Sequence, residues 1–148
     1  MECLVSYGYP TLFAVSFLAA TVAPLGSEWL LAALLVKGLD PAILLFAATS
    51  GNVLGAQTTW AIGIWGGPFL MERVLGIGKA SRQKAQRLYD RWGSWSLLMA
   101  WAPVVGDPLC LVGGLFGVPF WRFTLFVGAG KLARYAFLIY VVAQVSGR

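Results

Sequence analysis

Apolar residues fill two long stretches of the chain, 10–69 and 93–148, and a polar stretch, 70–92, lies between them. An α-helix needs about 20 predominantly apolar residues to cross a bilayer. Residues 41–67 are one apolar run of sufficient length and predict a transmembrane helix. The pattern therefore predicts membrane-embedded helices in two blocks.

Each block also contains a break, where helix-breaking residues stand beside an acid. Glu28 follows a proline and a glycine in the first block, and Asp107 lies next to a glycine and a proline in the second. Proline and glycine interrupt helices, and an acid inside lipid is costly. The residues expected to form the two breaks are Pro24, Gly26, Pro103, Gly106 and Pro108.

A shift of 79 residues places the second block on the first without a gap, and Glu28 then falls on Asp107 because 107 − 28 = 79. Further matches are Pro24 with Pro103, Leu30 with Leu109, Gly38 with Gly117, and Gly51 with Gly130. The shift predicts a single membrane domain, 1–148, made of a first repeat (10–69), a basic linker (70–92) and a second repeat (93–148).

The arms on either side of each break are too short to cross a bilayer singly, because about 12 helical residues reach only ~18 Å. Two such arms meeting at mid-depth form a re-entrant hairpin, and one hairpin plus one spanning helix inverts the second repeat. The predicted fold is an all-α integral membrane protein with two inverted repeats, each a re-entrant helical hairpin plus a transmembrane helix, joined by a basic amphipathic linker. Four spanning helices kinked at the prolines are the alternative.

Composition supports the membrane assignment. Hydrophobic residues make up 59% of the chain and charged residues 11%, with a mean hydropathy of +0.75. A soluble domain of this composition would lack the polar surface to cover its core. Without a cleavable signal peptide to explain the apolar start, the blocks themselves are expected to form a multi-pass membrane protein.

The net charge of +5 arises largely in the linker. Its basic residues are Arg73, Lys79, Arg82, Lys84, Arg87 and Arg91. Basic residues between apolar blocks indicate a cytoplasmic segment beside anionic headgroups, and not a nucleic-acid site. Residues 80–92 fit an amphipathic interfacial helix with Ala85, Leu88 and Trp92 on one face; a solvated linker helix remains the alternative.

Four ionisable residues lie inside the apolar blocks: Glu28, Asp107, Lys131 and Arg134. Such residues usually face the interior and pair with one another. Lys131 and Arg134 share a helix face near mid-depth, and Asn52 is the repeat counterpart of Lys131. Asp107 is expected to face Glu28. Either the charges only join the repeats, or the acids bind protons or cations while the bases meet an anionic substrate group.

Smaller signals concern packing and the membrane interface. Gly51 and Gly55 predict a close helix contact. Interface anchors are expected at Trp92, Trp95, Trp101, Trp121 and either Tyr135 or Tyr140. Hydrogen bonds inside the bundle are expected from Ser27, Gln57, Thr58 and Thr59. The chain has no histidine, and its cysteines, Cys3 and Cys110, are far apart, so no metal site, cofactor or enzyme activity is expected.

Several stretches resemble the YqaA group of the DedA superfamily, also called SNARE-associated or VTT-domain proteins. They are APLGSEWLLAALL (23–35), SGNVLGAQTTWAIG (50–63), RWGSWSLLMAWAPVVGDPLCLVGGLFGVPFWRF (91–123) and GKLARY (130–135). The resemblance covers nearly the whole chain and implies two re-entrant hairpins in inverted repeats. It also implies a part in membrane homeostasis through proton-linked transport, lipid-carrier flipping or lipid scrambling.

Glu28 matches the family's acid after the first hairpin's proline-glycine turn. The family's two arginines around the second hairpin's proline are replaced here by Ala100 (or Trp101 beside it) and Gly106. We expect Lys131 and Arg134 to supply the positive charge instead.

Together with the buried charges, the resemblance implies a transporter in a bacterial inner membrane that flips or scrambles a polyprenyl phosphate or phospholipid, driven by protons or cations bound at Glu28 and Asp107. Its partner would be a membrane lipid with an anionic headgroup, and an oligomer is compatible with this. A non-transporting membrane scaffold or assembly factor with structural salt bridges is the alternative.

Overall fold

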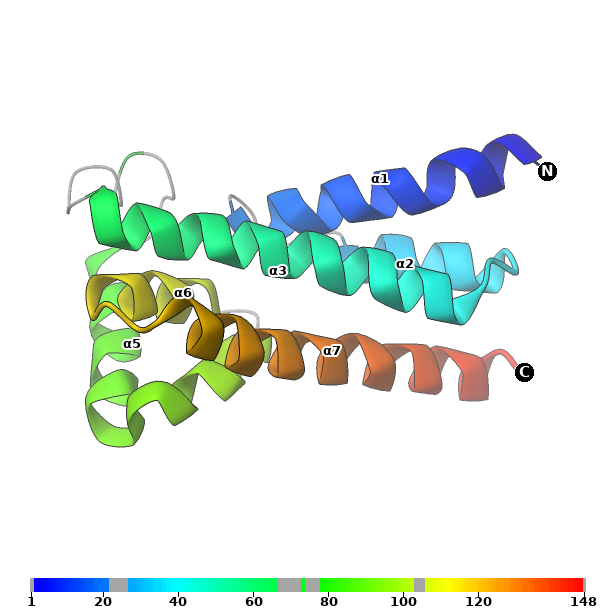
Figure 1. The fold of residues 1–148 in the computed structure, drawn as a ribbon. Helices are drawn as coiled ribbons and strands as arrows, with labels where there is room; N and C mark the ends of the chain where they lie inside the picture. The colour runs from blue at the N-terminus through cyan, green and yellow to red at the C-terminus, as the bar shows by residue number, and fades with distance from the viewer. Residues whose placement is uncertain (1, 22–26, 67–72, 74–77, 103–105, 148) are drawn as a thin grey trace.

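The computed structural model describes residues 2–21, 27–66, 73, 78–102 and 106–147, and every regular element in these ranges is a helix (Figure 1). The elements are α1 (Glu2–Thr21), α2 (Ser27–Val36), α3 (Pro41–Trp65), α5 (Lys79–Trp92), the 3₁₀ helix η1 (Gly93–Trp101), α6 (Gly106–Leu115) and α7 (Phe120–Val145). The expected all-α class is therefore confirmed for the described part of the chain.

The two longest helices, α3 and α7, run side by side along the molecule (Figure 1). Helices α1 and α2 lie toward one end of this pair, together with both chain termini, whereas α5, η1 and α6 lie toward the other. Contacts cross between the two halves of the chain, since α3 packs against α6 and α7 packs against α2. The two halves therefore form one structural unit.

Helix α2 and helix α6 occupy positions separated by 79 residues at both ends, and α3 and α7 begin at positions separated by the same interval. Both short helices end in the same way. Gly38 and Gly117 adopt positive φ values of 91° and 63°, and their amides donate to Leu35 and Gly114. Glycine takes this conformation at little cost, which explains why each short helix stops there.

The start of α3 is fixed by the residues before it. The Asp40 side chain accepts hydrogen bonds from the amides of Ala42 and Ile43 at 2.8 and 3.1 Å, and Pro41 takes the first helical position. An aspartate cap followed by proline is a strong helix start, because it satisfies free amides and presets φ. This start sets the position of every polar residue along α3.

Close helix contacts depend on glycine, as the sequence predicts for Gly51 and Gly55. A Cβ atom at either position would lie less than 3.0 Å from a backbone carbonyl oxygen of α1. The same holds for Gly114 of α6, whose added Cβ would collide with the carbonyl of Trp60 in α3. Helix α3 therefore touches α1 and α6 backbone to backbone.

Some predicted boundaries differ. Helix α1 begins at Glu2 instead of near residue 10, so the expectation of a short arm is wrong for this 20-residue helix. It continues through Pro10, whose ring removes only one backbone donor. Gly106 and Pro108 lie in the first turn of α6, where proline is tolerated because the amides have no helical partner. Pro24, Gly26 and Pro103, the other residues assigned to the breaks, lie outside the described residues.

The helix predicted over 80–92 is confirmed as α5, which packs against η1 and α6. Ala85 is buried and Leu88 half-buried, whereas Trp92, expected on the same face, is 57% exposed. Trp92 is the last residue of α5, and Gly93 follows it with φ 58°, so the chain turns away there. Arg87 and Arg91 are exposed.

By length and apolarity, α7 is the one helix in the described ranges that meets the criteria for crossing a membrane, and α2 is a shorter apolar helix. The predicted span over 41–67 appears as the 25-residue α3, which carries the polar residues Asn52, Gln57, Thr58 and Thr59. The outer surface of α7 is rich in exposed apolar side chains, among them Trp121, Leu125 and Phe137 at 81, 70 and 68%. Such a surface is typical of a helix that faces lipid.

Candidate functional site

The charged residues predicted from sequence meet near the middle of the molecule. Lys131 is the twelfth residue of α7 and Asn52 the twelfth of α3, ~17 Å along each helix. Glu28 and Asp107 are each the second residue of a short helix, α2 and α6. Each pair differs by 79 positions, so the two halves contribute matching positions to one site.

A single small cavity joins these residues. Its volume is about 20 Å³, room for roughly one water molecule. It is lined by Ala19, Ser27, Glu28, Asn52, Ala100, Ala102, Asp107, Lys131 and Arg134. The five residues predicted as substrate-binding or coupling groups therefore all face the same space, in which polar side chains predominate.

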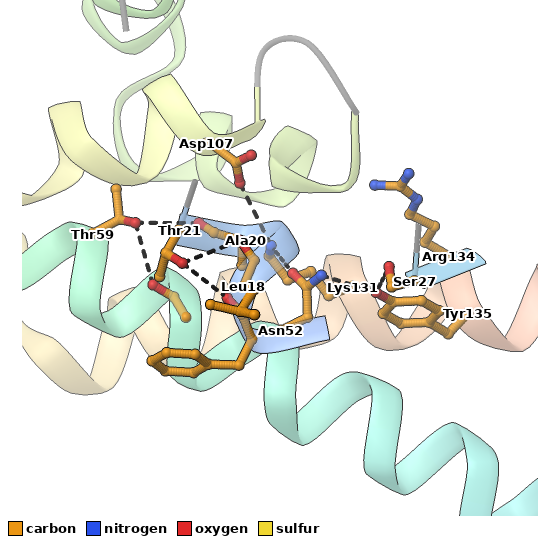
Figure 2. Close-up of polar contacts among 12 residues, drawn as sticks. Leu18, Ala20, Thr21, Ser27, Asn52, Thr59, Asp107, Lys131, Arg134 and Tyr135 are labelled. Carbon is orange, nitrogen blue, oxygen red and sulfur yellow. Dashed lines mark hydrogen bonds and ion pairs between the residues drawn. The ribbon is translucent and has the colours of Figure 1, made fainter. Parts of the chain in front are cut away.

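Lys131 is the most buried charged side chain of the cluster, with 5% of its side chain exposed. Figure 2 shows its amino group between Asp107 and Asn52. The Nζ atom donates a hydrogen bond to Oδ1 of Asn52 and lies 4.0 Å from Oδ1 of Asp107. The lysine thus contacts the residue 79 positions before it in the chain, and its ion pair with Asp107 is the looser of the two interactions.

Tyr135 extends this arrangement, although the sequence placed it among the candidate interface anchors. It is buried, with 2% exposure, and its hydroxyl accepts a hydrogen bond from Nδ2 of Asn52 at 2.9 Å. The same hydroxyl lies 3.0 Å from Oγ of Ser27 (Figure 2). Tyr140, the other tyrosine considered, is the exposed one, at 62%. Tyr135 is an interior residue because it lies one helical turn after Lys131, on the same face of α7.

The second ion pair connects the two halves of the chain. Arg134 Nη2 is paired with Oε1 of Glu28, and their side chains are 24% and 36% exposed. The two acids therefore line a common cavity, but each is paired with a base. This pair is more open to its surroundings than the pair of Lys131 and Asp107.

The chemistry available to the cluster is ionic. Two acids and two bases give a formal charge of zero, which suits a site surrounded by apolar helices. No group of three or more histidine, cysteine, aspartate or glutamate residues that could hold a metal occurs within the described ranges. An anion could be held by Lys131 and Arg134 if the acids took up protons, since its charge would then be balanced.

The hydrogen bonds expected inside the bundle are confirmed in three of four cases. Ser27 contacts Tyr135, Gln57 donates to Thr124 at 3.0 Å, and Thr59 donates to the carbonyl of Ala20 in α1 at 3.3 Å. Thr58 instead donates to its own helix. The sequence did not identify Ala19, Ala100 and Ala102 as lining residues, because small apolar residues carry no signal of a cavity.

Comparisons with known proteins cover most of the chain. Residues 23–144 match the VTT domain family. The chain is 39% identical over 128 residues to the inner membrane protein YqaA of Escherichia coli, covering 84% of both proteins. It is 34% identical over 138 residues to an uncharacterised protein of Haemophilus influenzae, covering 88% of the chain and 84% of that protein.

A more distant relative is an uncharacterised protein of Methanocaldococcus jannaschii, 26% identical over 140 residues. No solved structure matches the chain. The family match covers all the residues that line the central cavity except Ala19. The chain therefore belongs to the VTT-domain (DedA) family of membrane proteins.

Proposed function

We propose that this protein moves a lipid with an anionic headgroup, a polyprenyl phosphate or a phospholipid, from one leaflet of a bacterial inner membrane to the other. The main support is the neutral cluster of two acids and two bases at the centre of an otherwise apolar helix bundle. An uncompensated headgroup charge in hydrocarbon is very costly, and such a cluster supplies the compensation. The family membership and the name of the Escherichia coli relative agree with a membrane location.

The proposal includes two inverted repeats, each with a re-entrant hairpin. In this arrangement α1 with α2, and η1 with α6, are the hairpins, whereas α3 and α7 span the bilayer. Three features support it: the common interval of 79 residues, the matched ends of α2 and α6, and the location of both termini at the end opposite α5 (Figure 1). The basic α5 would face the cytoplasm and the termini the other side.

The residue roles follow from charge balance. Lys131 and Arg134 hold the lipid phosphate, which replaces the two acids as their partner. Glu28 and Asp107 take up protons or cations when this exchange occurs. Helices α2 and α6 both begin beside the cavity, and a helix N-terminus carries a partial positive charge that favours an anion. Proton uptake by the acids keeps the site close to neutral throughout.

The experiment is leaflet exchange of fluorescent polyprenyl phosphate and phospholipid in liposomes, with and without a pH gradient. The wild type should exceed empty liposomes for at least one lipid. Lys131→Gln should lower the rate at least tenfold, because a hydrogen bond to a charged group contributes about 1.5–3 kcal/mol. Lys84→Gln, an exposed lysine of α5, is the matched control and should exchange lipid normally. Wild-type rates equal to those of empty liposomes for every lipid would exclude transport of these lipids.

A membrane scaffold is the second candidate function, and it is favoured by one observation: both acids are already paired with bases. The two functions differ in the effect of exchanging the charges in Glu28→Arg/Arg134→Glu. A purely structural pair should regain stability and activity in the exchanged form. A transporter should regain stability but remain slow, because the acid would then lie on α7 and the base at the start of α2.

A further inference from the structure

A directed chain of hydrogen bonds ends at the amino group of Lys131. Lys131 can only donate, so Oδ1 of Asn52 is the acceptor, and the amide Nδ2 of Asn52 must then donate to Tyr135. The Tyr135 hydroxyl, having accepted this bond, has its own hydrogen available for Ser27. Tyr135 thus fixes the orientation of the Asn52 amide, and the amide oxygen accepts the hydrogen bond from Lys131 (Figure 2).

The distance from Lys131 to Asp107 is too long for a direct charge-assisted hydrogen bond. Such bonds measure about 2.7–2.9 Å, and the observed separation is 4.0 Å. The amino group is instead nearer to a neutral amide oxygen than to a carboxylate. Other ionisable side chains lining the cavity are Glu28 and Arg134, which pair with each other, while α1 and η1 contribute only alanines.

We propose that Tyr135 and Asn52 are positioning residues that hold the Lys131 amino group away from Asp107, so that an anionic phosphate can bind it. The identity of the ligand rests on the proposed function, whereas the positioning of the Lys131 amino group does not. Tyr135→Phe removes the acceptor that fixes the Asn52 amide and changes the buried volume little. Asn52 then rotates, and Lys131 moves into direct contact with Asp107, which competes with the ligand.

The expected effect is a loss of phosphate-lipid affinity of about 3- to 10-fold, the range that corresponds to one net hydrogen bond. The mechanism also predicts a dependence on Asp107. In an Asp107→Asn background no carboxylate is available to Lys131, so Tyr135→Phe should change the affinity less than about twofold. A residue with only a packing role would cause equal losses in both backgrounds.

The test combines lipid binding with a measurement that needs no lipid. Short-chain polyprenyl phosphate is titrated into the purified full chain in micelles, and ¹⁵N-lysine NMR reports the Lys131 amino group directly. The chain has four lysines, Lys37, Lys79, Lys84 and Lys131, so assignment requires few variants. Tyr140→Phe makes the same chemical change at an exposed site of α7 and is the control.

Tyr135→Phe should shift the Lys131 signal and lower the affinity, and Tyr140→Phe should do neither. An unchanged Lys131 signal in folded Tyr135→Phe would overturn the positioning role. If Tyr135→Phe does not fold, Ser27→Ala removes the other partner of the Tyr135 hydroxyl and must move the signal in the same direction. A shifted signal in a protein that binds no phosphate lipid would uphold the positioning role and refute the proposed function.

Discussion

Replacing Lys131 with methionine removes the buried charge on which the central cluster depends. Methionine has a similar length and no donor, so Oδ1 of Asn52 loses its hydrogen-bond donor and Asp107 loses its counter-charge. Both groups stay in place beside a cavity with room for about one water molecule. We therefore expect a loss of stability that comes mainly from Asn52 and Asp107, whose polar groups no longer face the lysine.

The magnitude follows from the geometry. Opposite charges 4.0 Å apart attract by about 4 kcal/mol at an effective dielectric constant of about 20. The wild type gains less than this, since burying Lys131 has a desolvation cost, and water reaches Asp107, whose side chain is 26% exposed. We expect Lys131→Met to lower the free energy of unfolding by about 2 kcal/mol, and Asp107→Asn by about 1–2 kcal/mol.

The assay is reversible unfolding in mixed micelles, followed by circular dichroism, for the wild type, both single variants and the double variant. Because the double variant leaves no unpaired charge, it should be more stable than Lys131→Met alone, with a coupling energy of about 2 kcal/mol. The corresponding cycle for Glu28 and Arg134 should give about 1 kcal/mol, because that pair is more exposed. Additive losses for Lys131 and Asp107 would show that the two do not interact and would refute the reasoning.

Three other predictions concern packing, backbone and topology. Gly114→Ala should lower the free energy of unfolding by at least about 2 kcal/mol, because its Cβ would collide with the backbone of α3, whereas Gly78→Ala, which has open space, should be neutral in the same unfolding assay. Gly117→Ala should be destabilising by about 1 kcal/mol because of its φ of 63°, and normal stability would contradict that explanation. In sealed vesicles, an impermeant thiol reagent should label Ser146→Cys, near the C-terminus, and Lys84→Cys from opposite sides; labelling from one side would favour four spanning helices over two hairpins.

Parts of the fold could be inferred from the sequence at positions where the local geometry accepts only glycine. Gly38 and Gly117 mark the ends of α2 and α6, because each needs a positive φ. Gly51 and Gly55 mark the contact of α3 with α1. The 3₁₀ geometry of η1 was not predictable, since its apolar residues suit an α-helix equally well.

The site was predictable to the extent that charge is costly in an apolar helix. Glu28, Asp107, Lys131 and Arg134 could be identified because each requires a partner inside the bundle. Which acid meets which base depends on how helices from different halves pack, and the sequence carries no signal for that. Tyr135 was ambiguous because tyrosine suits both a membrane interface and a buried hydrogen bond.

The central claim is that a lipid phosphate binds Lys131 and Arg134 beside the central cavity in place of the two acids, and thiol protection tests it directly. Ala102 lines the cavity, so Ala102→Cys is placed in a chain whose Cys3 and Cys110 are replaced by alanine, with lipid-exposed Leu125→Cys as control. We predict that a small water-soluble thiol reagent labels Ala102→Cys, and that polyprenyl phosphate slows this labelling whereas uncharged polyprenol does not. Labelling of Ala102→Cys that polyprenyl phosphate and polyprenol affect equally would contradict the claim.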